Sequence, residues 1–492
     1  MSSPTQDVPS PALLRLADRL RRLIGAAKVI TDPGQLRTYE CDGLTAFRVR
    51  PGVVVLAEHR DDVVATVRMC AEQNVPFVAR GSGTGLSGGA VPVADGVLIV
   101  LSRLRRIVSV DPDNARIVAE PGVINLWVTQ QAAPHRQAYA PDPSSQQVCS
   151  IGGNVAENSG GAHCLKYGFT VNHVMGAEVV LADGAVVHLG GSAPEHPGFD
   201  LLGAFVGSEG TLGVVTQVTV RLIQVPEAVQ TMLVGFRSVE DAAGTVSDII
   251  AAGILPAAIE MMDALAIEAA EAAVACGYPD GAVAVLVIEL DGPSIEVDEN
   301  FRQVHALAGA RNAFEIRIAR DGDERALMWR GRKSAFAAVG RISPAYYVQD
   351  GVIPRTRLPE VLAEIDRLAA VAGLRVANVF HAGDGNLHPL ILFDDTVDGA
   401  VHTAERLGFE ILDACLAVGG SITGEHGVGL EKKAKMADQF SADDLAAMQL
   451  LRCAFDPAGI ANPGKLMPTP RLCGERPGVR VGAPDPALGE VF

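Results

Sequence analysis

The spacing of apolar positions along the chain predicts most of its helices and strands. Residues 12–24 carry apolar side chains at helical intervals and predict an amphipathic helix. From Pro51 a β-branched strand, a helix and a second strand follow one another, and a glycine-dense segment then leads to a third strand, VLIVLS. Residues 107–120 and 174–190 alternate in polarity around turn-forming residues, so each segment predicts a β-hairpin.

The pattern changes after about residue 227. Residues 235–276 are rich in alanine and predict helix, whereas residues 281–292 predict a strand. Helices are expected at 294–307 and 358–372, and a further strand is expected at 374–380. Together these elements are typical of an α+β unit inserted as a second domain.

Glycines return near residue 420, and a helix predicted at 443–455 precedes the segment DPAGIANPGKLMP. The last twenty or so residues have no periodicity and predict a tail. The expected parts are an N-terminal helical segment at 1–50, a first domain at 51–227, an inserted domain at 228–420, a C-terminal segment at 421–470 and a tail at 471–492.

Composition narrows the class of protein. The chain has 492 residues, of which 48% are apolar and 20% are charged, so it can bury sizeable cores and is not a disordered chain. Its 41 basic and 58 acidic side chains give a net charge of −17, and no basic stripe is present, which argues against nucleic acid as a partner. No apolar run approaches the roughly 20 residues that a membrane-spanning helix needs.

The eight cysteines contain no C-x-x-C pair, which argues against a zinc ribbon, a dithiol redox motif and a ferredoxin-type cluster. We expect no disulfide framework, and the first residues do not have the pattern of a signal peptide. The sequence therefore predicts a cytoplasmic protein.

Three glycine-dense loops carry the first candidate chemistry. The spacing Gly83-x-Gly85-x-x-Gly88 matches a dinucleotide fingerprint, but no helix starts there and no acid ends the next strand, which argues against a nicotinamide Rossmann site. The glycines instead free backbone N–H groups to surround an anion. Similar loops recur at 150–161 and 207–213, so we expect one long, phosphate-bearing ligand rather than three unrelated surface loops.

A histidine-rich stretch is the second candidate for a functional site. In FHAGDGNLH, the dipeptide Asp384-Gly385 predicts a two-residue type I′ turn that places His381 opposite His388, where two imidazoles can share a cation. In GEHGVG, Glu425 would complete a His₂Glu set that leaves one coordination position open. The alternatives are a chance pair of structural histidines and a helix cap followed by an incidental His426.

At this point the sequence resembles a known family. RGSGTGLSGG, PDPSSQQVCSIGGNVAENSGG, LKYG, GSEGTLGVV and FDPAGIANPGKLMP resemble the flavoproteins of the vanillyl-alcohol oxidase and p-cresol methylhydroxylase superfamily. HAGDGNLHP and TGEHGVG are similar to signatures of the D-2-hydroxy-acid dehydrogenases, most closely the branch with the flavin subunit of bacterial glycolate oxidase and D-lactate dehydrogenases. The resemblance implies an α+β protein with a p-cresol-methylhydroxylase (PCMH)-type FAD-binding domain of two α+β subdomains, a ferredoxin-like α+β substrate domain and a helical C-terminal segment.

The resemblance also implies where FAD lies. The pyrophosphate would rest on residues 80–89, and the isoalloxazine would lie near residues 141–161 and His426. Relatives with covalently bound flavin carry a histidine in the first loop, and this loop has none, so we expect non-covalent FAD. The residues expected to bind it are Arg80, Gly81, Ser82, Gly83, Thr84, Gly85, Ser87, Gly88, Pro141, Asp142, Ser150, Gly152, Gly153, Asn154, Asn158, Gly160, Gly161, Glu209, Gly210, Val214, Val215 and Asn462.

For the reaction, the resemblance implies that His381, His388 and Glu425 bind a divalent metal, with zinc expected and manganese or iron as alternatives. His426 would be the catalytic base, and Arg332 would hold the substrate carboxylate. The expected activity is oxidation of a short 2-hydroxy acid, glycolate or D-lactate, to the 2-oxo acid by hydride transfer to flavin N5.

Val348 and Leu390 stand where the hydroxyglutarate enzymes carry polar residues, which argues against a dicarboxylate substrate. Three alternatives remain: a D-2-hydroxyglutarate type of dehydrogenase, another flavin chemistry such as alcohol oxidation or ether-lipid synthesis, and a non-catalytic electron-transfer subunit. Because this chain has no cluster motif, electrons would pass to oxygen, a quinone or another subunit, and the resemblance implies an iron–sulfur subunit. That partner would hold the protein at the inner face of the membrane, and the sequence leaves a homodimer open.

Overall fold

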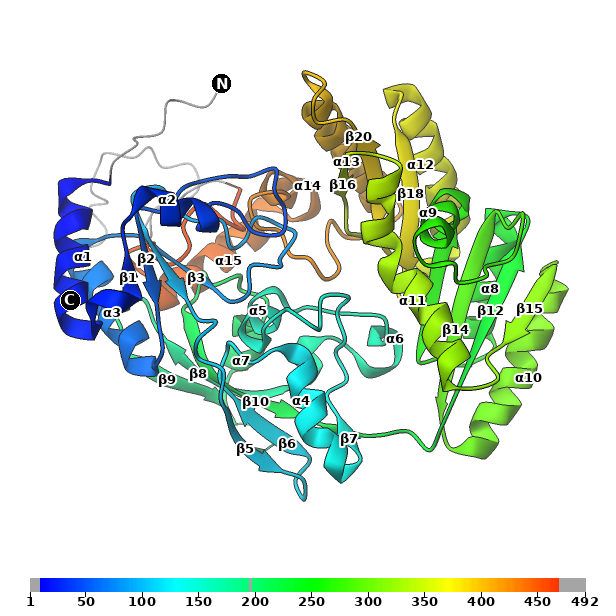
Figure 1. Ribbon diagram of the computed structural model, residues 1–492, viewed down its shortest axis with the longest axis horizontal. Coiled ribbons are helices and arrows are strands. Elements are labelled where there is room, and N and C mark those ends of the chain that lie inside the picture. Colours follow the sequence, from blue (N-terminus) through cyan, green and yellow to red (C-terminus); the bar gives the residue numbers. More distant parts are fainter. Residues whose placement is uncertain (1–8, 194–196, 469–492) are drawn as a thin grey trace.

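The structure is a computed structural model, and it describes residues 9–193 and 197–468. It has two lobes (Figure 1), of which one holds the first half of the chain together with the C-terminal helices. The other lobe, called the cap lobe below, holds residues 228–420. The chain crosses to the cap lobe after residue 224 and returns after residue 420, so the first lobe, called the flavin lobe below, is built from both ends of the sequence.

A small sheet and three helices form one side of the flavin lobe. Helix α1 spans Pro11–Ile24, as the apolar spacing predicts, and its buried Leu16 and Leu20 face the helix that follows β2. The sheet has the order β1-β2-β4-β3, in which β2, β4 and β3 are parallel. Its elements are β1 (Val29–Ile30), α2 (Pro33–Leu36), β2 (Val53–Leu56), α3 (Arg60–Gln73), β3 (Phe77–Arg80) and β4 (Val97–Val100).

An antiparallel sheet forms the other side, in the order β5-β6-β10-β8-β9. Both predicted hairpins, β5–β6 and β8–β9, are confirmed. The strands are β5 (Ile107–Asp111), β6 (Arg116–Ala119), β7 (Gln137–Ala138), β8 (Val174–Val180), β9 (Val186–Gly190), β10 (Val214–Arg221) and β11 (Ile223–Gln224), and the helices are α4 (Asn125–Ala132), α5 (Ile151–Glu157), α6 (Cys164–Tyr167) and α7 (Leu201–Phe205).

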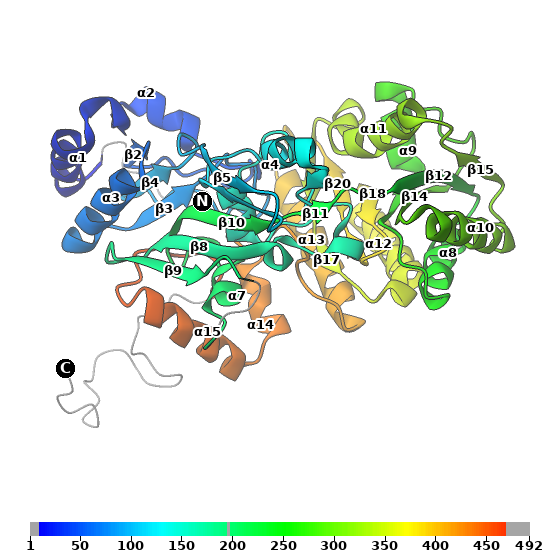
Figure 2. The same ribbon diagram turned by 90° about the horizontal axis from the view of Figure 1, so that it is seen from below.

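The cap lobe begins with an antiparallel sheet in the order β15-β12-β14-β13, with α8 and α10 packed against each other. This is the ferredoxin-like arrangement, so the expected α+β class is confirmed. The elements are β12 (Ala228–Phe236), α8 (Val239–Ala251), β13 (Ala258–Asp263), α9 (Ala264–Val274), β14 (Ala284–Gly292), α10 (Ser294–Ala310) and β15 (Glu315–Ile318). Figure 2 shows the same lobe from below.

The prediction of continuous helix at 235–276 is wrong, because β13 runs through its middle. This strand lies between β14 and β18, and its apolar residues enter cores on both faces of the sheet, Met261 in one and Met262 in the other. A strand buried on both faces has no alternation of polarity, so its pattern resembles that of a buried helix.

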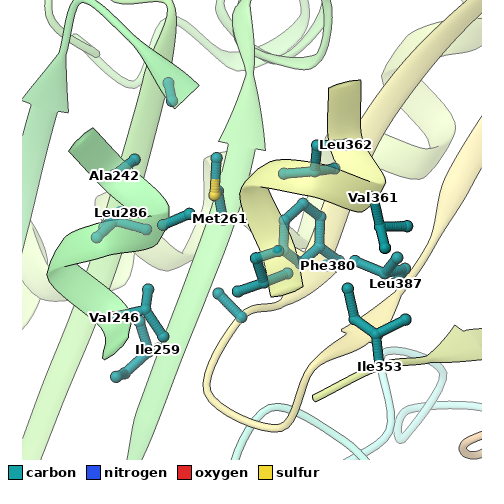
Figure 3. Packing of buried hydrophobic residues seen from close by; sticks show 14 of the residues in the cluster. Ala242, Val246, Ile259, Met261, Leu286, Ile353, Val361, Leu362, Phe380 and Leu387 are labelled. Carbon is teal, nitrogen blue, oxygen red and sulfur yellow. The ribbon is translucent and has the colours of Figure 1, made fainter. Parts of the chain in front are cut away.

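A second part of the cap lobe continues the sheet through β18, which pairs with β13. Phe380 on β18 packs under α12, against Leu362 and Leu387 (Figure 3). The elements are α11 (Gly322–Ala338), β16 (Ala345–Val348), β17 (Gly351–Val352), α12 (Leu358–Ala372), β18 (Arg375–His381), β19 (Asn386–Leu387), β20 (Pro389–Phe393) and α13 (Ala400–Ala417).

The C-terminal segment closes the flavin lobe through α14 (Met436–Gln439) and α15 (Ala442–Phe455). Beyond them, the backbone N–H of Asn462 donates to Phe77 of β3 at 2.8 Å. The predicted tail at 471–492 lies outside the described residues. Single 3₁₀ turns occupy Ala26–Lys28, Arg37–Tyr39, Ala133–His135, Thr170–Asn172, Val339–Arg341, Arg355–Arg357 and Lys433–Lys435.

Buried ion pairs join the two lobes. His163 of the flavin lobe has its Nδ1 atom 2.9 Å from Asp142 and its Nε2 atom 3.2 Å from Glu289 on β14. Burial alone lowers the pKa of His163, but the charges of Asp142 and Glu289 outweigh it and raise the pKa to about 10. The hydroxyl of Tyr167 donates to Asp291 at 2.6 Å, so α6 and the segment before it attach to one strand of the cap lobe.

Two expectations from composition can be compared with the fold. No helix within residues 9–193 and 197–468 is both long enough and apolar enough to cross a membrane. The sequence predicts no disulfide framework, and within the described residues Cys453 is the one cysteine that is disulfide-bonded. Six other cysteines are free thiols: Cys41, Cys70, Cys149, Cys164, Cys276 and Cys415.

Candidate active site

A cavity of roughly 450 Å³ lies between the glycine-rich loops of the flavin lobe and the cap lobe. Along most of its length it is lined by residues that belong to three segments, 79–90, 143–159 and 205–215. At one end it is lined by side chains from the cap lobe and the returning segment, namely Lys333, Phe336, Tyr346, His388, Glu425 and His426. The cavity therefore has a long wall of small residues and an end built from ionisable side chains.

The long wall is a set of loops held close together. Arg80 donates from Nε and Nη2 to the carbonyl of Ala90, at 3.2 and 2.6 Å, and so closes the first loop on itself. A Cβ atom on Gly81 would lie 2.1 Å from the hydroxyl of Ser150, which caps the N-terminus of α5. Only a residue without a side chain lets the first two glycine-rich loops approach this closely.

The structure brings most of the predicted cofactor residues to this wall. Those lining the cavity are Arg80, Gly81, Ser82, Gly83, Thr84, Gly85, Ser150, Gly152, Gly153, Asn154, Glu209, Gly210, Val214 and Val215. Predicted residues outside the lining are Ser87, Gly88, Pro141, Asp142, Asn158, Gly160, Gly161 and Asn462.

Several of the residues outside the lining support the loops from behind. Asn462 donates from its Nδ2 atom to the carbonyls of Gly89 and Glu209, at 2.9 and 2.6 Å, and so ties the first glycine-rich loop to the third. The carbonyl of Pro141 accepts from Asn125 at 3.1 Å. Among the described residues, these contacts are within the protein rather than into the cavity.

Glu157 is a cavity residue that the sequence analysis missed. Its Oε2 atom is buried and has no hydrogen-bond partner in the described part of the chain. Burial raises the pKa of Glu157 well above its usual value, and the neighbouring Glu209 carboxylate adds to the effect. The signal was present, since an acid interrupts the small residues of AENSGG.

The predicted turn between the two histidines is wrong in its register. His381 pairs with Asn386, and the connecting loop is Ala382–Gly385 rather than two residues. The carbonyl of His381 accepts from the N–H groups of Asp384 and Gly385, which closes a wider turn. The continuing register, with Asn378 opposite Pro389, shifts the pairing by two residues.

The two imidazoles nevertheless meet, because a shift of two residues keeps a side chain on the same face of a sheet. Their ring centroids are 5.1 Å apart and the planes are nearly perpendicular, at 83°. The Nε2 atoms of His381 and His388 lie 3.2 and 3.3 Å from Oε1 of Glu425. The three side chains offer ligand atoms that all lie within 4.8 Å of one another.

Two features of this trio fit a cation. Neither ring nitrogen of the buried His388 makes a well-directed hydrogen bond within the described residues, although carboxylate oxygens lie close to Nε2. Burial raises the pKa of Glu425, but His381 and His388 outweigh it and lower the pKa to about 2, so the carboxylate is ionised. Two imidazole nitrogens and one ionised carboxylate are donors that zinc, manganese and iron accept.

Glu260 on β13 connects this trio to Arg332. Its Oε1 atom accepts from Nδ1 of His381 at 2.7 Å, which directs the Nε2 atom of that ring toward Glu425. Its Oε2 atom accepts from Nε of Arg332 at 2.7 Å. Burial raises the pKa of Glu260, but Arg332 and His381 outweigh it, and the net effect is a lowered pKa.

Arg332 itself is buried on α11 and does not line the cavity, whereas the next residue, Lys333, does. The Nη2 atom of Arg332 is buried without a well-directed hydrogen-bond partner in the described residues. The sequence analysis missed Glu260, because it lies in the segment interpreted as helix. An isolated acid in the apolar run AIEMMD was the signal that could have revealed it.

His426 lies beside the trio. Its ring stacks on His388, with centroids 4.8 Å apart and planes within 2° of parallel. Its Nδ1 atom is buried without a hydrogen-bond partner in the described residues. Burial lowers the pKa of His426 to about 4 against the opposing charge of Asp350, so the ring is neutral near pH 7.

Val348 and Leu390, the positions that differ from the hydroxyglutarate enzymes, pair directly across β16 and β20. Both are buried in one hydrophobic core. Neither lines the cavity.

Comparisons with known proteins agree with this geometry. A family model described as "FAD binding domain" matches residues 51–190, and one described as "FAD linked oxidases, C-terminal domain" matches residues 225–466. The chain is 50% identical to glycolate oxidase subunit GlcD of Escherichia coli (strain K12) over 456 residues, which are 93% of this chain and 91% of the relative. It is 31% identical to D-lactate dehydrogenase of Anaerostipes hadrus, over 85% of this chain and 90% of the relative.

Solved structures of similar fold include a 4-ethylphenol oxidase from Gulosibacter chungangensis. It has a TM-score of 0.78 and 19% identity, with 95% of this chain and 99% of that chain covered. A p-cresol methylhydroxylase has a TM-score of 0.77 and 18% identity, with 93% and 97% covered. These likenesses show the PCMH-type fold.

Proposed function

The chain belongs to the FAD-linked oxidase family, and from this premise we propose that it oxidises a short 2-hydroxy acid, glycolate or D-lactate, to the 2-oxo acid. One observation carries the proposal. The His₂Glu trio and the neutral His426 meet at one end of the cavity whose long wall is made of the FAD-binding loops. A substrate at that end would lie between a proton acceptor and the cofactor.

FAD fits the long wall, since glycines and short hydroxyl side chains make up much of its lining and leave backbone N–H groups free to face an anion. Residues 80–89 contain no histidine, which supports non-covalent binding. When bound, FAD supplies the acceptor for the hydride that leaves C2 of the substrate. The remaining steps depend on residues of this chain.

His426 is suited to take the hydroxyl proton. Its ring is neutral because burial lowers its pKa, and its Nδ1 atom has no hydrogen-bond partner among the described residues. Loss of that proton together with the C2 hydride removes two protons and two electrons in all, which balances conversion of the alcohol to the ketone or aldehyde. The stacked His388 fixes the plane of the ring.

Arg332 is proposed to bind the substrate carboxylate. Its Nε atom donates to Oε2 of Glu260, and its buried Nη2 atom lies 2.7 Å from the same oxygen without a well-directed hydrogen bond, so an anion would share Nη2 with Glu260. A carboxylate there would satisfy a buried donor, and a guanidinium fork suits this task. Lys333 adds a positive charge at the same end of the cavity.

His381, His388 and Glu425 are proposed to hold a divalent cation, with zinc as the expected metal and manganese or iron as alternatives. When bound, the cation supplies a Lewis acid that lowers the pKa of the substrate hydroxyl. Glu260 supports this role, because a carboxylate behind a metal-binding histidine fixes its tautomer and orientation.

We also propose a partner for electron transfer. The relative that is 50% identical is named as a subunit, so a separate protein is expected to take electrons from the flavin, with an iron–sulfur subunit favoured over a quinone. The proposed location is the cytoplasm, at the inner face of the membrane when that partner is bound. A pull-down from the native cell followed by absorption spectroscopy for an iron–sulfur cluster would test this.

The experiment for the activity is a substrate panel with an artificial electron acceptor. Glycolate, D-lactate, L-lactate and D-2-hydroxyglutarate should be compared by kcat/KM, and the 2-oxo acid should be identified. We expect glycolate or D-lactate to lead by at least about tenfold, or about 1.4 kcal/mol in transition-state binding. A clear preference for D-2-hydroxyglutarate would favour the dicarboxylate alternative, and no turnover with any acid would contradict the proposal.

A further inference from the structure

Asp350 lies in the cap lobe, just before β17, and its carboxylate is buried. The loop that carries Glu425 and His426 surrounds this carboxylate. Its Oδ2 atom accepts from the N–H groups of Gly424 at 3.0 Å, His426 at 2.9 Å and Glu425 at 3.3 Å. The hydroxyl of Thr423 donates to the same oxygen at 2.5 Å. One side chain therefore binds three successive backbone N–H groups.

The contact extends beyond the carboxylate. The backbone carbonyl of Asp350 accepts from the N–H of Gly424 at 3.1 Å, and its Oδ1 atom lies 3.5 Å from Nε2 of His388. The ammonium of Lys432 lies 3.8 Å from Oδ2. A fully buried, ionised carboxylate is costly unless donors and positive charges surround it, and these contacts provide them.

The flavin lobe holds the same loop from the other side. Glu209 accepts from the N–H groups of Val428 and Gly429, both at 2.7 Å. Between the two carboxylates lies Gly427, with φ of +86°, where a Cβ atom would come within 2.2 Å of Glu157. The loop at 423–429 is thus fixed at one end by the cap lobe and at the other by the flavin lobe.

We propose that Asp350 is the positioning residue for Glu425 and His426: by binding their backbone N–H groups it sets where the carboxylate meets the two histidines and where the imidazole faces the cavity. The chemical roles of Glu425 and His426 come from the proposed function, whereas the ordering of the loop by Asp350 does not depend on it. Asp350 does not line the cavity, so it acts on the cavity through the loop and through its contact with His388.

The test compares Asp350→Asn with Asp263→Asn in the FAD-loaded, full-length enzyme. Asp263 is also a cap-lobe carboxylate that accepts three N–H hydrogen bonds, from Ala266 and Asn378, but it does not touch the loop. An asparagine at position 350 keeps the size of the side chain and turns an amide donor toward backbone donors. Thr423→Val, which removes only the hydroxyl contact, is the milder second variant if Asp350→Asn does not fold.

Three readouts separate positioning from general stability. Hydrogen–deuterium exchange of residues 421–430 should rise at least about tenfold in Asp350→Asn and remain unchanged in Asp263→Asn. The affinity for zinc, measured by chelator competition, should fall about 10- to 100-fold. The kcat should fall about 100-fold with little change in KM, because a displacement near 1 Å is costly for chemistry but not for binding.

Slow exchange of residues 421–430 in Asp350→Asn would overturn the proposal, as would fast exchange with normal zinc affinity and normal kcat. If the wild-type enzyme oxidised no 2-hydroxy acid, the proposed function would fail, and the exchange measurement would still decide the role of Asp350. With Thr423→Val we expect the same three changes at about three- to tenfold.

Discussion

The long wall and the cap-lobe end of one cavity are built in different ways. The wall presents glycines, hydroxyl side chains and backbone N–H groups from three loops of the flavin lobe. The cap-lobe end presents buried carboxylates and imidazoles, each compensated by a partner from a different segment, as in the contacts of Glu260 and Asp350. The difference teaches that local sequence determines a wall of backbone donors. A charged cluster depends instead on the tertiary structure, which brings its members together from distant segments.

The largest loss of activity should come from a substitution at the cap-lobe end of the cavity, called the charged end below, at His388. His388→Ala removes one of the two imidazoles of the His₂Glu trio, so the protein should lose its metal and its turnover should fall on the order of 100-fold or more, with FAD still bound. Elemental analysis and the flavin spectrum check both statements. His402→Ala, on the exposed surface of α13, is the matched control and should change neither.

Glu260→Gln should have the next largest effect, because it should lower both the stability of the protein and its activity. The substitution removes the charge that pairs with Arg332 and leaves that guanidinium buried, which typically costs about 3–5 kcal/mol. Urea unfolding measures the loss, and a raised KM for the 2-hydroxy acid would reveal the displaced Arg332. Glu364→Gln breaks an exposed pair with Arg367 and should cost less than about 0.5 kcal/mol. Equal losses in the two variants would contradict the assignment of the charged end as tightly coupled.

The wall should be sensitive to size rather than to charge. A Cβ atom on Gly152 would come within 2.5 Å of Cβ and 3.0 Å of the carbonyl oxygen of Pro121, so Gly152→Ala must shift α5, which lines the cavity, away from Pro121. We expect FAD affinity, measured by flavin fluorescence, to fall about tenfold or more, or about 1.4 kcal/mol. Gly309→Ala, in α10 with no atom within 4 Å of the new methyl group, should stabilise the protein by about 0.5–1 kcal/mol and leave FAD binding intact. Unchanged FAD affinity in Gly152→Ala would place the cofactor elsewhere.

The contact between the lobes gives the smallest effect and a dependence on pH. The folded pKa of His163, about 10, lies above the usual value near 6.5. Its charge therefore contributes stability that is full below about pH 6.5 and is lost as the pH rises through about 10. His163→Gln should lower the free energy of unfolding by about 1–2 kcal/mol at pH 6, measured as a lower Tm. The difference in stability from wild type should shrink toward pH 10.

His188→Gln is the control for that series, because this exposed side chain has only a surface pair with Glu178. It should change stability by less than about 0.5 kcal/mol at any pH in the range. A difference between wild type and His163→Gln that grows with pH would have the wrong sign for the proposed pairing.

The same contrast explains what the sequence could predict. The glycine loops, both hairpins and helix α1 follow from local patterns, and the structure confirms the elements. The meeting of His381 and His388 was predicted from the wrong turn, and it survived because the true register differs by two residues. Motifs within one contiguous segment can thus be recognised from the sequence alone.

The partners of Glu260 and Asp350 could not be found in this way. Glu260 acts on a histidine 121 residues later in the chain, and Asp350 acts on N–H groups 74 to 76 residues away. Nothing in their local sequence marks those partners, since the pairing of β13 with β18 and the return of the chain after residue 420 bring them together. The role of Arg332, in contrast, was suggested by the resemblance to relatives. That resemblance could not show that Nε of Arg332 donates to Glu260.

The central claim is that the charged end of the cavity oxidises a short 2-hydroxy acid while FAD lies along the wall. The most direct test mixes the FAD- and zinc-loaded enzyme with glycolate and, separately, with D-lactate in the absence of oxygen, and follows the flavin absorbance. We predict that at least one of the two acids bleaches the flavin and yields one 2-oxo acid per flavin. A flavin that stays oxidised with both acids would contradict it.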